Sequence, residues 1–128
     1  MLDKIRKRIL ADLDAVPGGF RSDSVVRELI RCVLYGFMKE QGLIPVPDYR
    51  VPRYPEGPVD LAAMNGKYDI IFAFAAGPTV ELAQVKSMER VEAERKVIIT
   101  FSHHERKVKE SAFFLKKDIE HLYLYEKA

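Results

Sequence analysis

The fold of this chain depends on residues 59–87, which read VDLAAMNGKYDIIFAFAAGPTVELAQVKS. Two apolar segments, Val59–Met64 and Tyr68–Ala75, flank the pair Asn65-Gly66, and Asn-Gly is typical of a two-residue type I′ turn. The spacing therefore predicts an antiparallel β-hairpin. Ala76-Gly77-Pro78 predicts a second turn, because Gly and Pro interrupt regular structure.

The next segment, Thr79–Ser87, decides between two architectures. Its apolar residues fit a buried strand, and we expect it to form the third strand of an antiparallel meander. The same segment also has good helix propensity, and in the alternative a helix runs from Thr79 to Lys96. The two alternatives place the polar residues of this segment differently relative to the hairpin.

Helical patterns come before the hairpin. Apolar residues recur at helical spacing over Leu2–Leu13 and over Val25–Met38, and the polar pair Ser22-Asp23 can cap the second helix. Five prolines between residues 43 and 58 exclude a central strand there and leave room only for an irregular edge strand through Tyr49–Tyr54.

The C-terminal part alternates strand and helix patterns. Val97–Phe101 is a β-rich apolar run and predicts a buried strand. Ser102 and Glu105 are spaced as a capping box, which predicts a helix whose apolar stripe extends over Val108–Ile119. His121–Tyr125 predicts a last strand.

Length and composition favour a single domain over residues 1–128, with a helical extension at 1–19 and a core at 22–126. Of 128 residues, 48% are hydrophobic and the net charge is +2, so nucleic-acid affinity would need local clusters of charge. No apolar run approaches the roughly 20 residues of a membrane span, and the N-terminus lacks a signal peptide pattern. Cys32 is expected as a buried, reduced thiol, which suits a cytoplasmic protein.

Several short motifs resemble those of the PD-(D/E)XK nuclease superfamily, over roughly residues 22–126. They are Val59-Asp60-Leu61, Tyr68-Asp69-Ile70-Ile71 and Glu81-Leu82-Ala83-Gln84-Val85-Lys86-Ser87, with Glu28 on the preceding helix. The chain is most similar to the Mrr-like restriction endonucleases, in which Gln often replaces the acid of the (D/E)XK element, and more loosely to archaeal Holliday-junction resolvases. The resemblance implies an α/β (α+β) restriction-endonuclease-like domain. In it, a helix and a three-strand antiparallel meander precede a helix, strand, helix and strand, and helices flank a central mixed sheet.

The resemblance also implies a catalytic site. Phosphodiester hydrolysis requires a hard divalent cation on oxygen ligands, an aligned water and positive charge near phosphorus. Asp69 and Gln84 would bind Mg²⁺ or Mn²⁺, Lys86 would position the water and Glu28 would assist. A four-residue loop at 75–78 places Asp69 opposite Gln84, whereas a three-residue loop turns Gln84 and Lys86 to the other face.

Asp60 is a second candidate for the metal ligand. A two-residue turn at Asn65-Gly66 puts Asp60 on the same face of the hairpin as Asp69. If Thr79–Lys96 is helical instead, Asp60 takes the place of the family's Asp and Ala75 falls near the acid position. The site then lacks a ligand.

Two functions follow from these alternatives. The first is a metal-dependent DNA endonuclease, which as a small nuclease of this type implies a homodimer. The second is a non-catalytic nuclease-fold module that binds DNA or a protein partner. Aromatic residues interleave little with the basic residues, so the sequence does not indicate single-strand stacking. The basic residues expected to hold phosphates are Arg21, Arg50, Arg53, Lys107, Lys109 and Lys116.

Overall fold

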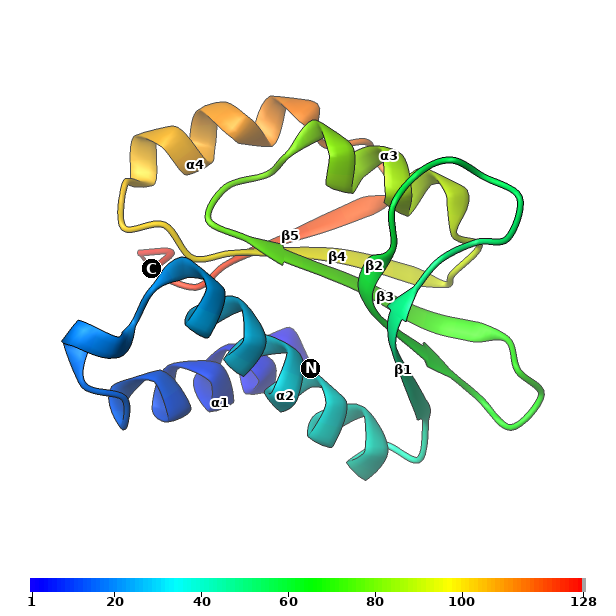
Figure 1. Ribbon diagram of the computed structural model, residues 1–128, viewed down its shortest axis with the longest axis horizontal. Coiled ribbons are helices and arrows are strands. Elements are labelled where there is room, and N and C mark those ends of the chain that lie inside the picture. Colours follow the sequence, from blue (N-terminus) through cyan, green and yellow to red (C-terminus); the bar gives the residue numbers. More distant parts are fainter. Residues whose placement is uncertain (128) are drawn as a thin grey trace.

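The computed structural model describes residues 1–127 and has an α+β architecture built on one mixed sheet (Figure 1). No helix among these residues is both long enough and apolar enough to span a membrane. The elements are the α-helices α1 (Leu2–Asp14), α2 (Asp23–Glu40), α3 (Leu82–Arg90) and α4 (Glu105–Ser111), the 3-10 helices η1 (Gly18–Phe20) and η2 (Ala112–Phe114), and the strands β1 (Ile44–Tyr49), β2 (Val59–Met64), β3 (Ile70–Gly77), β4 (Arg95–Thr100) and β5 (Ile119–Tyr123).

The five strands lie across the sheet in their sequence order, from β1 to β5. The pairs β1–β2 and β2–β3 are antiparallel, whereas β3–β4 and β4–β5 are parallel. β1 contains Pro45 and Pro47, and the edge of a sheet is where a strand without these N–H donors is tolerated. Because β3 and β4 are parallel, the chain must cross over between them, and α3 forms this crossover.

Helices cover both faces of the sheet (Figure 1). α1 and α2 pack on one face, where Ile9 and Phe37 join Phe74 of β3 in the larger core cluster. α3 covers the opposite face, where Val85 and Met88 belong to the smaller core cluster. Figure 1 shows α4 on the same side as α3. The strands β2, β3 and β4 are therefore mostly buried, whereas the edge strand β1 is largely exposed.

The expectation that Thr79–Ser87 forms a strand is wrong, because α3 begins inside this segment. Glu81 and Gln84 form a capping box that starts the helix. Val85 and Met88, three residues apart, are both buried in the same cluster, as helical spacing allows and strand alternation does not. The antiparallel three-strand meander exists, but its strands are β1, β2 and β3.

The β2–β3 hairpin is present with a longer connection than the two-residue turn expected at Asn65-Gly66. Met64 pairs with Ile70, which leaves residues 65–69 in the loop. The Asn65 side-chain oxygen accepts two backbone N–H bonds from within this loop, at 2.9 and 3.0 Å. Asn65 therefore shapes the loop through its side chain instead of occupying a type I′ turn.

The longer loop changes the cross-strand partner of Asp60. Leu61 pairs with Phe74, and continuing this register places Asp60 opposite Ala75. Asp69 lies in the loop, outside the strand. The shared face expected for Asp60 and Asp69 is therefore not formed.

The C-terminal part keeps the expected order of elements with shifted boundaries. β4 and β5 each begin two residues before the expected runs. The Ser102 hydroxyl accepts the N–H of His104 at 3.1 Å, and α4 begins only at Glu105. α4 then ends at Ser111, well before Ile119, and the chain continues as η2.

Cys32 is exposed on α2, so the expectation of a buried thiol is wrong. The next two residues of the helix, Val33 and Leu34, occupy the buried positions instead. The apolar stripe of α2 is therefore narrower than its sequence pattern suggests.

Candidate functional site

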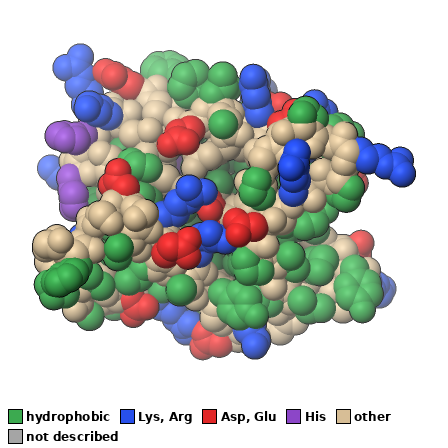
Figure 2. All heavy atoms as spheres, in the orientation of Figure 1, with side chains coloured by type: hydrophobic (Ala, Val, Ile, Leu, Met, Phe, Trp, Pro, Cys, Tyr) green, Lys and Arg blue, Asp and Glu red, His purple; other side chains and the backbone are tan. Residues whose placement is uncertain are grey.

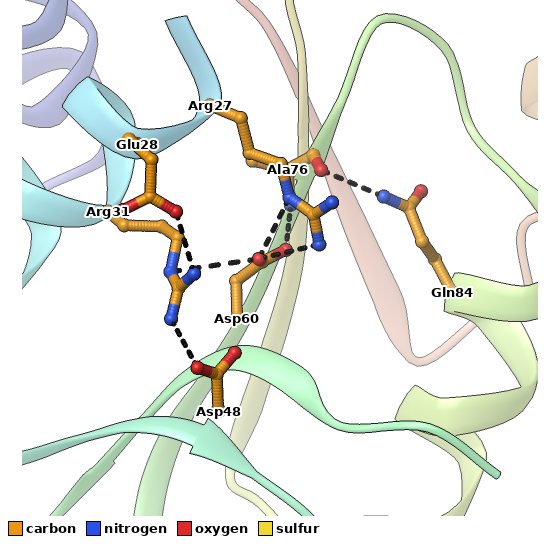
Figure 3. Close-up of polar contacts among 7 residues, drawn as sticks. All are labelled: Arg27, Glu28, Arg31, Asp48, Asp60, Ala76 and Gln84. Carbon is orange, nitrogen blue, oxygen red and sulfur yellow. Dashed lines mark hydrogen bonds and ion pairs between the residues drawn. The ribbon is translucent and has the colours of Figure 1, made fainter. Parts of the chain in front are cut away.

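A cleft opens at the carboxyl ends of β3 and β4, between the N-terminal ends of α2 and α3. Open α/β sheets commonly bind ligands at such strand ends, where neighbouring helices go to opposite faces of the sheet. The cleft has a volume of about 730 Å³. Figure 3 shows polar side chains that converge here from α2, β1, β2 and α3. The charged lining residues are Asp23, Arg27, Glu28, Arg31, Asp48 and Glu81.

Asp60 on β2 is the buried centre of the polar network, with only 2% of its side chain exposed. Its Oδ1 accepts hydrogen bonds from Nε and Nη2 of Arg27, at 3.1 and 2.9 Å. Its Oδ2 accepts the N–H of Ala76 at 2.8 Å. A carboxylate tolerates burial only when it is paired and hydrogen-bonded. Arg27 and the β3 backbone together provide these partners for Asp60.

Arg31 lies one helical turn after Arg27 and contacts three carboxylates (Figure 3). Its nitrogens lie 2.9 Å from Glu28, 2.9 Å from Asp48 and 3.9 Å from Asp60. Burial of the guanidinium opposes its charge, but the hydrogen bond to Asp48 and the nearby carboxylates outweigh burial and raise the pKa of Arg31. Arg31 therefore stays charged, and its donors are used inside the network.

Gln84 faces the cleft from the first turn of α3, but both ends of its amide are occupied. Its Nε2 donates to the carbonyl of Ala76 at 3.0 Å, and its Oε1 accepts the N–H of Glu81 at 3.2 Å. Gly77 permits this approach, because a Cβ at this position would lie 2.9 Å from Nε2 of Gln84. Gln84 thus ties the start of α3 to the end of β3.

The structure brings together three of the five expected catalytic residues. Glu28 and Gln84 line the cleft, and the buried Asp60 is bound to its lining residues Arg27 and Ala76 (Figure 3). Asp69 lies before β3, at the other end of that strand, so the expected pairing of Asp69 with Gln84 is wrong. Lys86 is exposed on α3 and does not line the cleft. Two residues along a helix turn a side chain by about 200°, so Lys86 cannot share the direction of Gln84.

The oxygen atoms of Asp60 and Gln84 already accept hydrogen bonds from the protein. Mg²⁺ is held by oxygen ligands, and the protein's own donors compete with the ion for them. Both oxygens of Asp60 are engaged by Arg27 and a backbone N–H, and the oxygen of Gln84 accepts another backbone N–H. Ala75, opposite Asp60, offers no ligand. Within residues 1–127, no group of three His, Cys, Asp or Glu side chains is placed to hold a metal ion. Of the two alternatives for Thr79–Ser87, the helical one is closer to the structure, although α3 covers only Leu82–Arg90 and not Thr79–Lys96.

The three arginines expected to hold phosphates are not gathered in one surface. Arg21 donates to the carbonyl of Val16 at 2.7 Å, so its side chain is folded back onto its own segment. Arg50 donates to two carbonyls at residues 54 and 55, and Arg53 is exposed in the same proline-rich loop. The hydrogen bonds of Arg21 and Arg50 are therefore local.

The three lysines expected to hold phosphates lie on or just after α4. Lys109 pairs with Glu105 at 3.0 Å, and Lys116 lies 3.9 Å from Glu89. Lys107 has no ion pair within residues 1–127. In the view of Figure 2, basic side chains are interspersed with acidic ones elsewhere on the surface. The segment of α4 is therefore the best candidate for an anion-binding surface.

Arg27 and Arg31 are the site residues that the sequence analysis did not find. They are four residues apart on α2, which places them on one side of the helix. This spacing was a usable signal, because a buried strand carboxylate needs a basic partner. The partner itself could not be identified, since 33 residues separate Arg27 from Asp60.

Comparisons with known protein families, with curated proteins and with solved structures find no match for this chain. What the chain does is therefore inferred from its geometry and from the motifs that resemble those of the nuclease superfamily.

Proposed function

We propose that this chain is a nuclease-like module that binds DNA without cutting it. The order of elements supports this proposal: α2, the β1–β2–β3 meander, α3, β4, α4 and β5 follow the order that a restriction-endonuclease-like domain implies. In that frame Asp60 corresponds to the family's Asp, and Ala75 stands near the acid that would complete the metal site. The second ligand is thus missing where hydrolysis needs it.

The observation that carries the proposal is the neutralisation of Asp60 by Arg27. To bind a metal ion, Asp60 would have to give up two hydrogen bonds from Arg27 and one from Ala76. Hydrogen bonds to charged groups contribute about 1.5–3 kcal/mol each. Coordination of a metal ion by one carboxylate, with no second protein ligand, does not offset the loss of these hydrogen bonds. The positive charge of the cleft is therefore supplied by a guanidinium.

The charge distribution favours a DNA contact outside the cleft. The cleft lining has two basic residues and four acidic ones, in addition to the buried Asp60, and this excess disfavours a phosphate backbone there. The segment from Glu105 to Lys117 has five basic residues and two acidic ones. We therefore expect α4 and the residues after it to contact the phosphates.

Binding and cleavage assays on the same DNA test the proposal. We expect binding of a fluorescent duplex that weakens with salt, and no nicking of supercoiled plasmid in Mg²⁺ or Mn²⁺. Lys107→Gln should lower the salt slope by about one unit, whereas the matched exposed variant Lys67→Gln on the β2–β3 loop should not. Plasmid nicking that Asp60→Asn abolishes, or the absence of salt-dependent binding, would contradict the proposal.

A metal-dependent endonuclease using Mg²⁺ or Mn²⁺ is the second candidate. It is favoured by the gathering of Asp60, Glu28 and Gln84 at one cleft. Arg27 donates two hydrogen bonds to Asp60 and competes with a metal ion for it. An endonuclease should therefore cleave faster as the Arg27→Ala variant, whereas a binding module should cleave neither as wild type nor as this variant. The homodimer also belongs to this candidate, since cutting both strands takes two sites. Light scattering on the wild-type protein measures its mass.

A further inference from the structure

The segment of α4 and η2 presents two aromatic side chains to solvent. Phe113 is 90% exposed and Phe114 is 48% exposed. Within residues 1–127, no other large hydrophobic side chain is as exposed as Phe113. Large apolar side chains that protrude from a folded domain commonly mark a contact with a partner. The two phenylalanines fall off the apolar stripe that the sequence predicts for this helix.

The rings are held outside by the way in which α4 ends. Val108 is fully buried and anchors the helix. The hydroxyl of Ser111 donates to the carbonyl of Val108 at 2.7 Å and accepts the N–H of Val80 at 3.0 Å. This double contact fixes the last turn of α4 against the segment before α3. η2 follows directly and has no buried residue, so the exposed rings start from an anchored point.

Basic side chains flank the two rings along the chain. Arg106, Lys107 and Lys109 precede them, and Lys116 and Lys117 follow them. Arg106 and Lys109 each have an i,i+4 partner, Glu110 and Glu105, whereas Lys107 and Lys117 have no ion pair within residues 1–127. Figure 2 shows hydrophobic side chains reaching the surface above α4, with basic side chains to either side. The segment therefore combines exposed aromatic area with a net positive charge.

We infer that Phe113 stacks on an unpaired base of single-stranded DNA, while Lys107 and Lys117 contact the phosphates on either side. This inference deepens the proposed DNA binding and rests on it. An exposed aromatic ring with cations before and after it in the chain resembles the arrangement by which proteins hold single strands without reading their sequence. Residues of a 3-10 helix point about 120° apart, so Phe113 and Phe114 face different directions and one ring presents itself to one base.

A membrane surface fits this segment less well. An interfacial helix needs a broad apolar face to enter the bilayer. α4 has seven residues, and Val108, its buried apolar residue, already faces the core. Single-stranded DNA needs only one accessible ring and nearby cations.

The test uses the whole chain and a fluorescent oligo-dT probe, with a duplex of the same length and with anionic vesicles as separate arms. Phe113→Ala should lower oligo-dT affinity about tenfold and leave duplex affinity unchanged, because only unpaired bases can stack. Phe20→Ala is the matched control: Phe20 is 69% exposed on η1, outside the α4 and η2 segment, and this change should have no effect. Lys107→Gln and Lys117→Gln should each reduce the salt slope for oligo-dT by about 0.7.

The outcomes separate this inference from the proposed function. If the wild type binds the duplex but Phe113→Ala binds oligo-dT as tightly as the wild type, the stacking role is overturned and DNA binding stands. If the wild type binds neither DNA, both fail. If it binds only anionic vesicles, and loses them on Phe113→Ala, the surface is a membrane contact and the inference is overturned. Circular dichroism of Phe113→Ala confirms that the variant is folded.

Discussion

The cleft at the strand ends and the surface of α4 and η2 differ in what their side chains contact. At the cleft, Asp60, Arg31 and Gln84 are each bound to other groups of the protein. On α4 and η2, Phe113 projects into solvent and Lys107 has no ion pair within residues 1–127. Side chains at the cleft are therefore mostly bound to other groups of the protein, whereas side chains on α4 and η2 remain accessible to a partner.

Because of this difference, the place with room for a ligand is not the place where binding costs the least free energy. A ligand entering the cleft must displace charge-assisted hydrogen bonds that already exist, and an unpaired buried charge is costly. A ligand on the α4 surface displaces mainly water. The cleft is thus weaker support for ligand binding than the accessible side chains on the α4 surface.

The largest expected effect comes from opening the network at the cleft. Asp60→Ala should lower the free energy of unfolding by about 3 kcal/mol, because it leaves the Ala76 N–H and the Arg27 guanidinium without their buried acceptor. Urea denaturation measures this loss. Asp48→Asn removes an exposed carboxylate from the same network and should cost less than about 1 kcal/mol. Equal losses in the two variants would mean that Asp60 is not the centre of the network.

The anchor of η2 should show an intermediate effect. Ser111→Ala removes a hydroxyl that bridges Val80 and Val108, and it should cost about 1–2 kcal/mol. Ser87→Ala is the control: its hydroxyl only bonds back to the Ala83 carbonyl within α3, and its removal should cost less than about 0.5 kcal/mol. A Ser111→Ala protein as stable as the wild type would show that η2 is not fixed by this contact.

A pH effect on stability should arise outside both regions, at His121 on β5. Burial lowers the pKa of His121 below 6.5, and its ring hydrogen-bonds Thr100 at 2.8 Å. The unfolded chain therefore takes up a proton first as the pH falls, so stability present above about pH 6.5 is lost below it. Because the ring is only half-buried, we expect a loss below about 1 kcal/mol. His121→Gln should remove this dependence, and a slope unchanged in that variant would assign it to another group.

The smallest effect on stability is expected at Phe113. Phe113→Ala should change the free energy of unfolding by less than about 0.5 kcal/mol, because a side chain that is 90% exposed loses almost no burial. Thermal and urea unfolding measure it. A loss above 1 kcal/mol would indicate that the ring packs on the domain, and the contrast between the two regions would then disappear.

The sequence predicted the parts of the fold that strong local signals determine. Ser22 caps α2, and its side chain accepts the N–H of Val25 as the capping pattern implies. β3 is apolar on both faces, and it forms a strand buried on both sides. Thr79–Ser87 was assigned wrongly, because a short apolar run satisfies both the strand and the helix period. The capping box of α3 starts with Glu81 and not with the usual Ser or Thr, so the sequence pattern did not indicate a helix start there.

The candidate site was predicted only in part, for a different reason. Asp60 was recognised as a candidate on its own strand, and the consequence of a helical Thr79–Ser87 was that a ligand would be missing. Arg27, which donates two hydrogen bonds to Asp60, lies 33 residues earlier on α2. Such a contact depends on how α2 packs on the sheet, and no periodicity within α2 contains that information.

The most direct test of the account is thermal unfolding of the wild-type chain titrated with MgCl₂ or MnCl₂, against NaCl at the same ionic strength. A ligand that binds only the folded state raises Tm, and the rise grows with the logarithm of the ligand concentration above Kd. Because Arg27 and the Ala76 N–H engage Asp60, we predict the same Tm in the divalent salts as in NaCl. A rise in Tm that grows with the Mg²⁺ or Mn²⁺ concentration, and that is absent in Asp60→Asn, would contradict the account and favour the metal-dependent nuclease.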